Sequence, residues 1–182
     1  MHSPRLSSIP NIKVLRVALA TGLTLAVAAI PASAKTTGKE SFRGQIIAPA
    51  TSGTRHVASS IIDSEGVFTS VGKIVEVPNQ PGDPANVSRD NLVFPAGTLH
   101  TRNTSQAPKI SLDQQTCAVT AMIKQTTKVQ GGTRKFRHAT GTFASTVHAW
   151  GVAARNPDGS CNPQADLLLD ADAVSGEGTL SF

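Results

Sequence analysis

From residue 41 onward, apolar side chains recur at every second position in short runs that Gly, Pro, Asn and Asp separate. A period of two is typical of antiparallel strands that bury one face, and this region has no convincing amphipathic helix. The pattern predicts eight or nine strands. They span residues 41–48, 55–63, 66–77, 91–94, 97–103, 117–129, 141–153, 165–174 and 178–182.

Two of the predicted strands alternate clearly. Residues 117–129 carry mostly apolar side chains at odd positions and mostly Thr and Lys at even positions. Residues 165–174 alternate apolar side chains with carboxylates, at Asp166, Asp170 and Asp172. We interpret these three carboxylates as the solvated outer face of a strand, because such a face is the usual result of alternation. A pair of carboxylates for acid–base chemistry is the alternative.

The connections between the predicted strands are short. Residues 63–66 read as a tight connection, the glycines at 131–132 as a second break, residues 156–159 as a turn, and residues 79–90 as a polar loop. A succession of antiparallel strands must bury one face of its sheet. The sequence therefore predicts an all-β fold, either a single antiparallel eight-stranded barrel or a two-sheet sandwich, and the pattern alone does not choose between them.

The first 34 residues have the three parts of an export signal: basic residues at Arg5, Lys13 and Arg16, an apolar stretch, and small residues at Ala32 and Ala34. We expect cleavage after Ala34. The apolar run is shorter than the roughly 20 residues of a membrane-spanning helix, so a retained anchor is the weaker alternative and no stable membrane span is expected after cleavage. The mature chain, residues 35–182, is then one secreted, extracellular domain.

Removal of the leader changes the charge and the expected partners. The full chain has 17 Lys and Arg against 12 Asp and Glu; without the three basic residues of the leader the balance is 14 against 12, a net charge of about +2. A nucleic-acid partner loses its main support. The two cysteines, Cys117 and Cys161, both lie in the exported part, and an oxidising compartment favours a disulfide between them over two free thiols.

A family resemblance adds to this interpretation. The segments NLVFPAGTL (91–99) and GGTRKFRHATG (131–141), with Cys117 between them, resemble secreted actinobacterial proteins with the allene-oxide-cyclase or dirigent-like barrel. The resemblance spans roughly residues 90–182. It implies an eight-stranded barrel with a mouth or interior that holds an apolar small molecule. Arg134 and His138 stand where the family usually has glycine, and Phe136 replaces its tyrosine, which indicates a reshaped turn.

Motifs for chemistry are scarce. His56, His100, His138 and His148 lack the spacing of metal ligands, and the sequence has no G-x-S-x-G elbow of a hydrolase, so we expect no metal and no cofactor. Residues 134–138 form a small basic cluster around Phe136, which we interpret as a solvated hairpin tip. An anionic surface or acidic polymer as its partner is the alternative.

The candidate pocket residues are Glu76, His148, Trp150 and Asp170. We expect a non-enzymatic secreted barrel that binds a small apolar ligand or a cell-envelope component. An isomerase or cyclase that acts on an unsaturated lipid-like substrate is the second hypothesis, and it rests on the resemblance alone. The third hypothesis is a structural or interaction protein of the cell exterior, which would act alone or as an oligomer.

Overall fold

The computed structural model describes residues 35–51, 54–55, 57–164 and 167–182. The expected leader lies outside this range, as do His56 and Asp166, so cleavage after Ala34 stays a prediction. The described chain consists of strands and one short 3-10 helix, η1 (Arg134–Phe136). The strands are β1 (Thr37–Thr51), β2 (Thr54–Arg55), β3 (Ser59–Gly66), β4 (Ser70–Val77), β5 (Val87–Phe94), β6 (Gly97–Ser105), β7 (Lys109–Leu112), β8 (Ala118–Gly132), β9 (Thr140–Ala153) and β10 (Leu167–Ser181).

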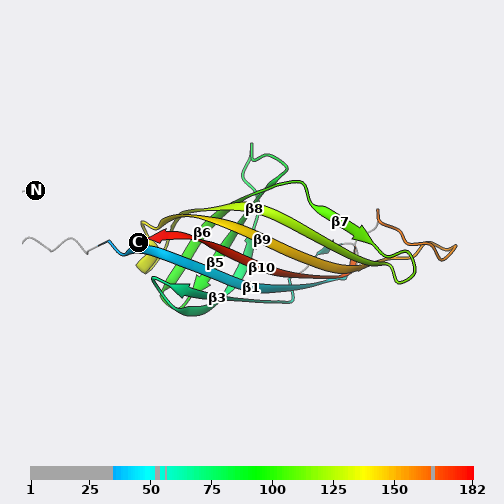
Figure 1. Cartoon of the computed structure of the whole chain (residues 1–182), viewed down its shortest axis with the longest axis horizontal. Helices are drawn as coiled ribbons and strands as arrows, with labels where there is room; N and C mark the ends of the chain where they lie inside the picture. Colours follow the sequence, from blue (N-terminus) through cyan, green and yellow to red (C-terminus); the bar gives the residue numbers. More distant parts are fainter. Residues whose placement is uncertain (1–34, 52–53, 56, 165–166) are drawn as a thin grey trace, which may run out of the picture. The chain divides into compact units, whose positions relative to one another are not determined.

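Eight of these strands close into an antiparallel barrel (Figure 1). Hydrogen-bonded neighbours follow the order β10-β9-β8-β6-β5-β4-β3-β1, and β10 also pairs with β1. The closing ladder runs from Thr37 opposite Ser181 to Pro49 opposite Leu169. Because the last strand pairs with the first, the sheet has no free edge along this ladder. The predicted barrel is confirmed, and the two-sheet sandwich is excluded.

The barrel has long strands on one side and short strands on the other. Strands β1, β8, β9 and β10 have 14 or 15 residues, whereas β3 to β6 have eight or nine. At about 3.3 Å per residue, the long strands reach roughly 20 Å beyond the short ones. We call this part of the sheet the extension (Figure 1). It comprises residues 48–51, 118–122, 148–153 and 167–171.

Three sequence predictions about connections were wrong. Strand β3 continues through residues 63–66 to Gly66, and the turn follows at 67–69, where the Ser64 hydroxyl donates to the carbonyls of Phe68 and Ser70. Strand β5 begins at Val87, inside the predicted loop 79–90. Residues 165–174 and 178–182 were predicted as separate strands, but the described residues 167–181 form the single strand β10.

The glycines of β10 explain the third error. Gly176 and Gly178 read as strand breakers in the sequence, but a β-carbon at Gly178 would lie 2.8 Å from the Cα of Phe143 and 2.9 Å from its ring. The absence of a side chain therefore makes room for a buried phenylalanine on the neighbouring strand. Strand β7 pairs with β8 and was not predicted at all.

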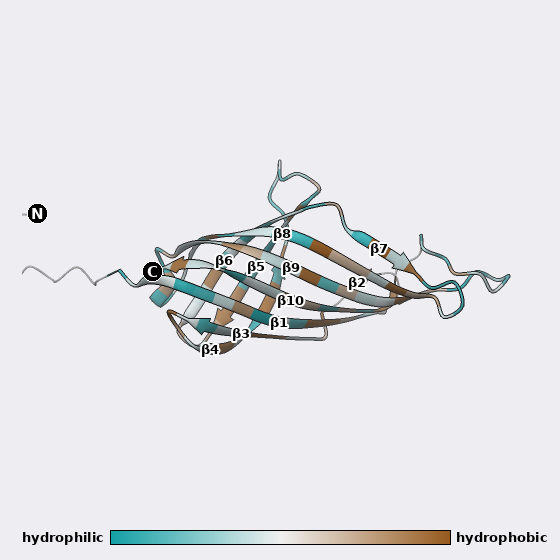
Figure 2. Cartoon of the chain, in the orientation of Figure 1, coloured by the Kyte–Doolittle hydropathy of each residue, from teal (hydrophilic) through white to brown (hydrophobic). Residues whose placement is uncertain are grey.

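One end of the barrel interior is filled by phenylalanine side chains. The ring centroids of Phe42 and Phe143 lie 4.9 Å apart, those of Phe68 and Phe136 also 4.9 Å, and Phe182 packs on Phe136 at 5.2 Å. We call this the plugged end. It contains most of the buried core, and Figure 2 shows the apolar positions of the strands that surround it. Aromatic rings therefore occupy the interior of the barrel at this end.

The plugged end also holds a buried carboxyl group. Glu40 on β1 is 2 % exposed, and its Oε2 accepts a hydrogen bond of 3.1 Å from the backbone N–H of Phe68. Its Oε1 has no hydrogen-bond partner among the described residues. Burial raises the pKa of Glu40 above its ordinary value of 4.5. The folded protein therefore binds a proton at Glu40 more tightly than the unfolded chain does.

We expect the free energy of unfolding to depend less on pH in Glu40→Gln than in the wild-type protein. Because the pKa is raised in the folded state, the free energy of unfolding falls as pH increases from the ordinary value through the raised value. Gln keeps an acceptor for the Phe68 N–H and carries no charge, so the variant should show a flatter pH profile between pH 4 and 8 in urea unfolding.

Glu40→Ala is the matched comparison. It leaves the buried Phe68 N–H without its acceptor and should cost about 1–3 kcal/mol at pH 4. Identical pH profiles for wild type and Glu40→Gln would contradict the assignment of the pH effect to Glu40.

The connection between β8 and β9 anchors the plug. Helix η1 places Phe136 in the core at 0 % exposure, while Arg134, Lys135 and Arg137 stay exposed. Arg134 adopts a positive φ of 50°. This is the left-handed region that glycine usually occupies, and a non-glycine residue there costs roughly 1–2 kcal/mol. The strain is tolerated because the turn positions Phe136 in the core.

The predicted disulfide is confirmed. Cys117 and Cys161 are bonded, with 44 residues of sequence separation, and both side chains are buried. They form a second small core with Ala153, against which Leu112, Val119 and Leu167 pack. This core lies in the extension, where the bond ties the loop between β9 and β10 to the start of β8.

Candidate functional site

The barrel interior is hollow on the side of the extension. A cavity of about 450 Å³ opens where the short strands end, at residues 76–77, 88–90 and 105. Its wall on the long strands is formed by Ile46, Ile123, Val147, Asp172 and Val174. A smaller hollow of about 60 Å³ lies next to it and reaches the ring of Phe42. Since Ile46, Asp90 and Val174 line both, we treat the two as one barrel cavity.

A chain of hydrogen bonds crosses the inner wall of this cavity. Asn103 donates to the Asp90 carboxylate at 2.6 Å, and its Oδ1 accepts from the Thr127 hydroxyl at 2.8 Å. The Thr127 and Ser145 hydroxyls are 3.0 Å apart. Asn103 is 3 % exposed and Ser145 is 8 % exposed. These side chains come from β5, β6, β8 and β9, so four neighbouring strands build one polar stripe.

The wall opposite the polar stripe is apolar. Ile46, Ile62 and Ile74, on β1, β3 and β4, are buried around the inner hollow. A cavity with one apolar wall and one hydrogen-bonding stripe is the usual form of a small-molecule site, and volumes of about 300–1,000 Å³ are typical of such sites. The arrangement therefore suits a compact apolar molecule that carries at least one polar group.

Carboxylates stand at the mouth of the cavity. Glu76 on β4 lies directly opposite Asp90 on β5, and Asp172 on β10 lines the same hollow. Directly opposite residues in an antiparallel pair have β-carbons about 4.5–5.5 Å apart. The side chains of Glu76 and Asp90 therefore belong to one local negative region at the boundary between the cavity and solvent.

The loop beside the mouth is held by an ion pair. Arg89 donates to the Asp83 carboxylate at 2.7 Å, and Asn79 donates to the Val87 carbonyl at 2.7 Å. The hydrogen bond from Arg89 and that from the backbone of Gln80 lower the pKa of Asp83 to about 2. Its contribution to stability is present above the ordinary value of 3.8 and is lost only as pH falls toward 2. The loop is therefore held in the same way throughout the neutral range.

The candidate pocket residues from the sequence lie in different places. Glu76 lines the cavity mouth. Asp170 is half-buried in the extension and is outside the lining of the cavity. His148 borders a shallow depression on the outer face of the barrel, and Trp150 is 45 % exposed on that same face of β9. The cavity is therefore built without His148 and Trp150.

The interpretation of Asp172 as part of a solvated outer face was wrong, because Asp172 lines the cavity. A β-bulge explains the error. Leu167 pairs with Ala153 while Leu169 pairs with Val152, so one extra residue enters β10 between them. An extra residue reverses which side of the sheet the following side chains face. Leu169 consequently is 41 % exposed on the outer face.

Other residues of the site had no signal in the sequence. Asp90 falls in a segment that reads as a loop, and Asn103 and Thr127 are polar side chains that a strand pattern assigns no role. Only their shared hydrogen bonds identify them. Asn103 shares the parity of Leu99 in the predicted strand 97–103, and this parity is the one signal that could have placed it on the inner face.

Two further sequence predictions concern His100 and metal binding. His100 and Asn91 form a hydrogen bond of 2.6 Å between Nδ1 and Oδ1. No group of three or more His, Cys, Asp and Glu side chains is arranged to hold a metal ion within the described ranges. Those ranges also contain no helix with the length and apolar character needed to cross a membrane.

Comparisons with protein-family models, with curated proteins and with solved structures found no match. The family resemblance therefore stays a prediction, and the geometry of the cavity carries the functional argument.

Proposed function

We propose that this protein is a secreted binding protein whose barrel cavity takes a small, largely apolar molecule with a polar group. The observation that carries the proposal is the polar stripe from Asp90 to Ser145 facing an apolar wall inside one cavity. The stripe orients the polar group of the ligand, and the apolar wall contributes most of the affinity by removing apolar surface from water.

The extension supports entry of such a ligand. By register, Ile110 on β7 lies opposite Ala121 on β8, and Ala121 lies opposite Ala149 on β9. Residues that lie opposite each other share one face of a sheet. Ala121 and Ala149 are two residues from Ile123 and Val147, which line the cavity, so all of these side chains are on the same face. Ile110 is 65 % exposed. An apolar strip of the sheet thus leads from solvent to the mouth of the cavity.

Secretion is the second part of the proposal. The disulfide supports it, because such bonds persist in oxidising compartments outside the cytosol. The leader-like first 34 residues supply the export route. The resemblance to allene-oxide-cyclase or dirigent-like barrels is consistent with a cavity ligand and remains part of the proposal.

The test uses N-phenyl-1-naphthylamine, a neutral aromatic probe whose fluorescence rises in apolar surroundings. We expect Val147→Phe, which places a larger side chain in the cavity, to weaken probe binding by roughly tenfold or more. His148→Phe is the matched control, because it adds the same ring to the outer face of the same strand and should leave binding within about twofold. Equal affinity of both variants and wild type would refute the cavity as the binding site.

A second candidate function is an isomerase or cyclase for an unsaturated lipid-like substrate. The observation that favours it is the carboxylate of Asp90, which lines an otherwise largely apolar inner hollow. A carboxylate in such surroundings serves as a general base, and in an isomerisation the proton that it removes returns to another atom of the same molecule.

Turnover of a panel of unsaturated epoxides separates the two functions. An enzyme should lose activity in Asp90→Asn while retaining probe binding in the cavity. No turnover by the wild-type protein would eliminate the enzymatic candidate and leave the binding protein.

A further inference from the structure

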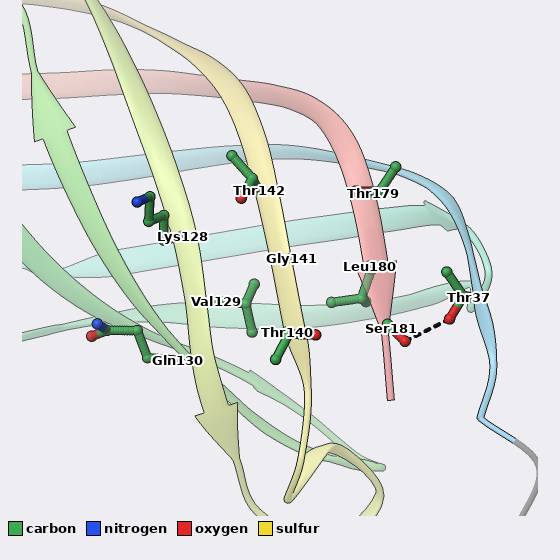
Figure 3. A pocket seen from close by; sticks show the side chains of 10 residues that line it. All are labelled: Thr37, Lys128, Val129, Gln130, Thr140, Gly141, Thr142, Thr179, Leu180 and Ser181. Carbon is green, nitrogen blue, oxygen red and sulfur yellow. Dashed lines mark hydrogen bonds between the residues drawn. The ribbon is translucent and has the colours of Figure 1, made fainter.

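A second hollow lies on the outer face of the barrel, away from the cavity. It has a volume of about 500 Å³ and crosses the ends of β8, β9 and β10 to reach Thr37 on β1 (Figure 3). Two rows of side chains border it, and the register of the strands aligns them. The first row is Lys128, Thr142 and Thr179, and the second is Gln130, Thr140 and Ser181. We call this hollow the outer trough.

The floor of the outer trough is backbone. Val129 and Leu180 are buried with their side chains in the core, and Gly141 between them has no side chain. The trough therefore lies between two successive outward rows, with polar walls and a flat base. At about 4.8 Å per strand, four strands give it a length of roughly 14 Å. This shape suits an extended chain that lies across the strands.

The walls offer hydrogen bonds of both kinds. Thr140, Thr142, Thr179 and Ser181 carry hydroxyls, which donate and accept, and the Gln130 amide does the same. Thr37 and Ser181 already share a hydrogen bond of 2.5 Å, and Arg89 donates to Gln130 at 3.0 Å. Such a wall matches a ligand that is itself rich in hydroxyls.

Positive charge surrounds the trough. Lys128 begins the first row, and Lys39 on β1 extends it, directly opposite Thr179. The connection that joins Gln130 to Thr140 carries the exposed basic cluster of Arg134, Lys135, Arg137 and His138. None of the described residues that line the trough is Asp or Glu. Glu177 on β10 precedes Thr179 by two residues and lies outside the lining.

We propose that the outer trough and the basic cluster bind an acidic polysaccharide. Charge complementarity selects an anionic partner, and the rows of hydroxyls pair with the hydroxyls of its sugar rings. A single-stranded nucleic acid needs aromatic side chains on which its bases stack. A bilayer surface needs apolar side chains that insert between lipids. None of the large apolar side chains exposed in the described part of the chain lines the trough.

The test measures binding of polygalacturonate, a linear chain of acidic sugars, by isothermal titration calorimetry, with neutral dextran as the uncharged comparison. Lys39→Gln, Lys128→Gln and Arg137→Gln together should weaken polygalacturonate binding by roughly tenfold or more. The combination Lys73→Gln, Lys109→Gln and Lys124→Gln is the control. It removes the same charge from exposed lysines outside the trough and should change affinity by less than about threefold.

A second pair of variants separates recognition of sugars from general attraction of anions. Thr140→Val and Thr142→Val together remove two hydroxyls without changing charge and should weaken polygalacturonate binding by roughly fivefold to tenfold. Circular dichroism verifies that these variants keep the fold.

Three outcomes would overturn the proposal. The first is absence of polygalacturonate binding by the wild-type protein. The second is an equal effect of the two sets of charge-removing variants, which would indicate attraction by net charge alone. The third is binding of phosphatidylglycerol vesicles or single-stranded DNA as tightly as polygalacturonate, with no effect of the threonine variants. The Val147→Phe variant should bind polygalacturonate as the wild-type protein does, because Val147 lies in the barrel cavity and outside the trough. A failure of the polysaccharide proposal is therefore distinguishable from a failure of the proposed ligand binding in the cavity.

Discussion

Replacement of Phe136 by alanine is expected to lower the free energy of unfolding by about 3–5 kcal/mol. Phe136 is fully buried, and its ring contacts the rings of Phe68 and Phe182 at centroid distances of 4.9 and 5.2 Å. Truncation removes apolar surface from the core and leaves a space that the barrel wall cannot close, because β8 and β9 are held by their neighbours.

Urea unfolding, followed by far-ultraviolet circular dichroism, measures this loss. Val71→Ala is the control, because Val71 is 56 % exposed on β4 and should cost less than about 1 kcal/mol. A loss of stability below 1 kcal/mol in Phe136→Ala would show that the plugged end is not the packed core described above. If the variant fails to fold, Phe136→Leu, with an expected cost of about 1–2 kcal/mol, supplies the measurement.

The double variant Cys117→Ala and Cys161→Ala is expected to lose about 4 kcal/mol of stability. The bond closes a loop of 44 residues, and the loss of unfolded-state entropy on closing a loop of that length corresponds to this value at 25 °C. The extension should unfold first, because its small core of Cys117, Ala153 and Cys161 has few other contacts.

Amide hydrogen exchange tests where the effect lies. Faster exchange should be confined to β7, the start of β8 and the loop between β9 and β10, while the plugged end exchanges more slowly in both proteins. Reduction of the wild-type protein should reproduce the change, and the double variant should be insensitive to the reductant. A double variant as stable as the wild-type protein would contradict a stabilising role for this bond.

The site illustrates why a strand pattern reaches only part of the function. Glu76 was among the candidate pocket residues from the sequence, and it does line the mouth. Asp90, Asn103 and Thr127 become neighbours only when β5, β6 and β8 pair. Each belongs to a different strand, so no spacing along the chain records their contact.

The bulge in β10 shows a second reason why the alternation of residues does not predict the site. Leu167 follows the predicted parity, but the extra residue before Leu169 reverses it, and Asp172 faces the cavity instead of solvent. A bulge is stabilised by the neighbouring strand. The pattern of apolar and polar residues in one strand carries no information about that neighbour.

The sequence by itself determined the β-sheet architecture, the pairing of Cys117 with Cys161 and the buried face of most strands, because a period of two and an even number of cysteines are local or compositional properties. The tertiary structure alone decided that β1 closes on β10, which end of the barrel is filled with phenylalanine rings, and which polar side chains share the cavity. The physical reason is that closure and packing depend on contacts between strands far apart in the chain, and these form only once the barrel is complete.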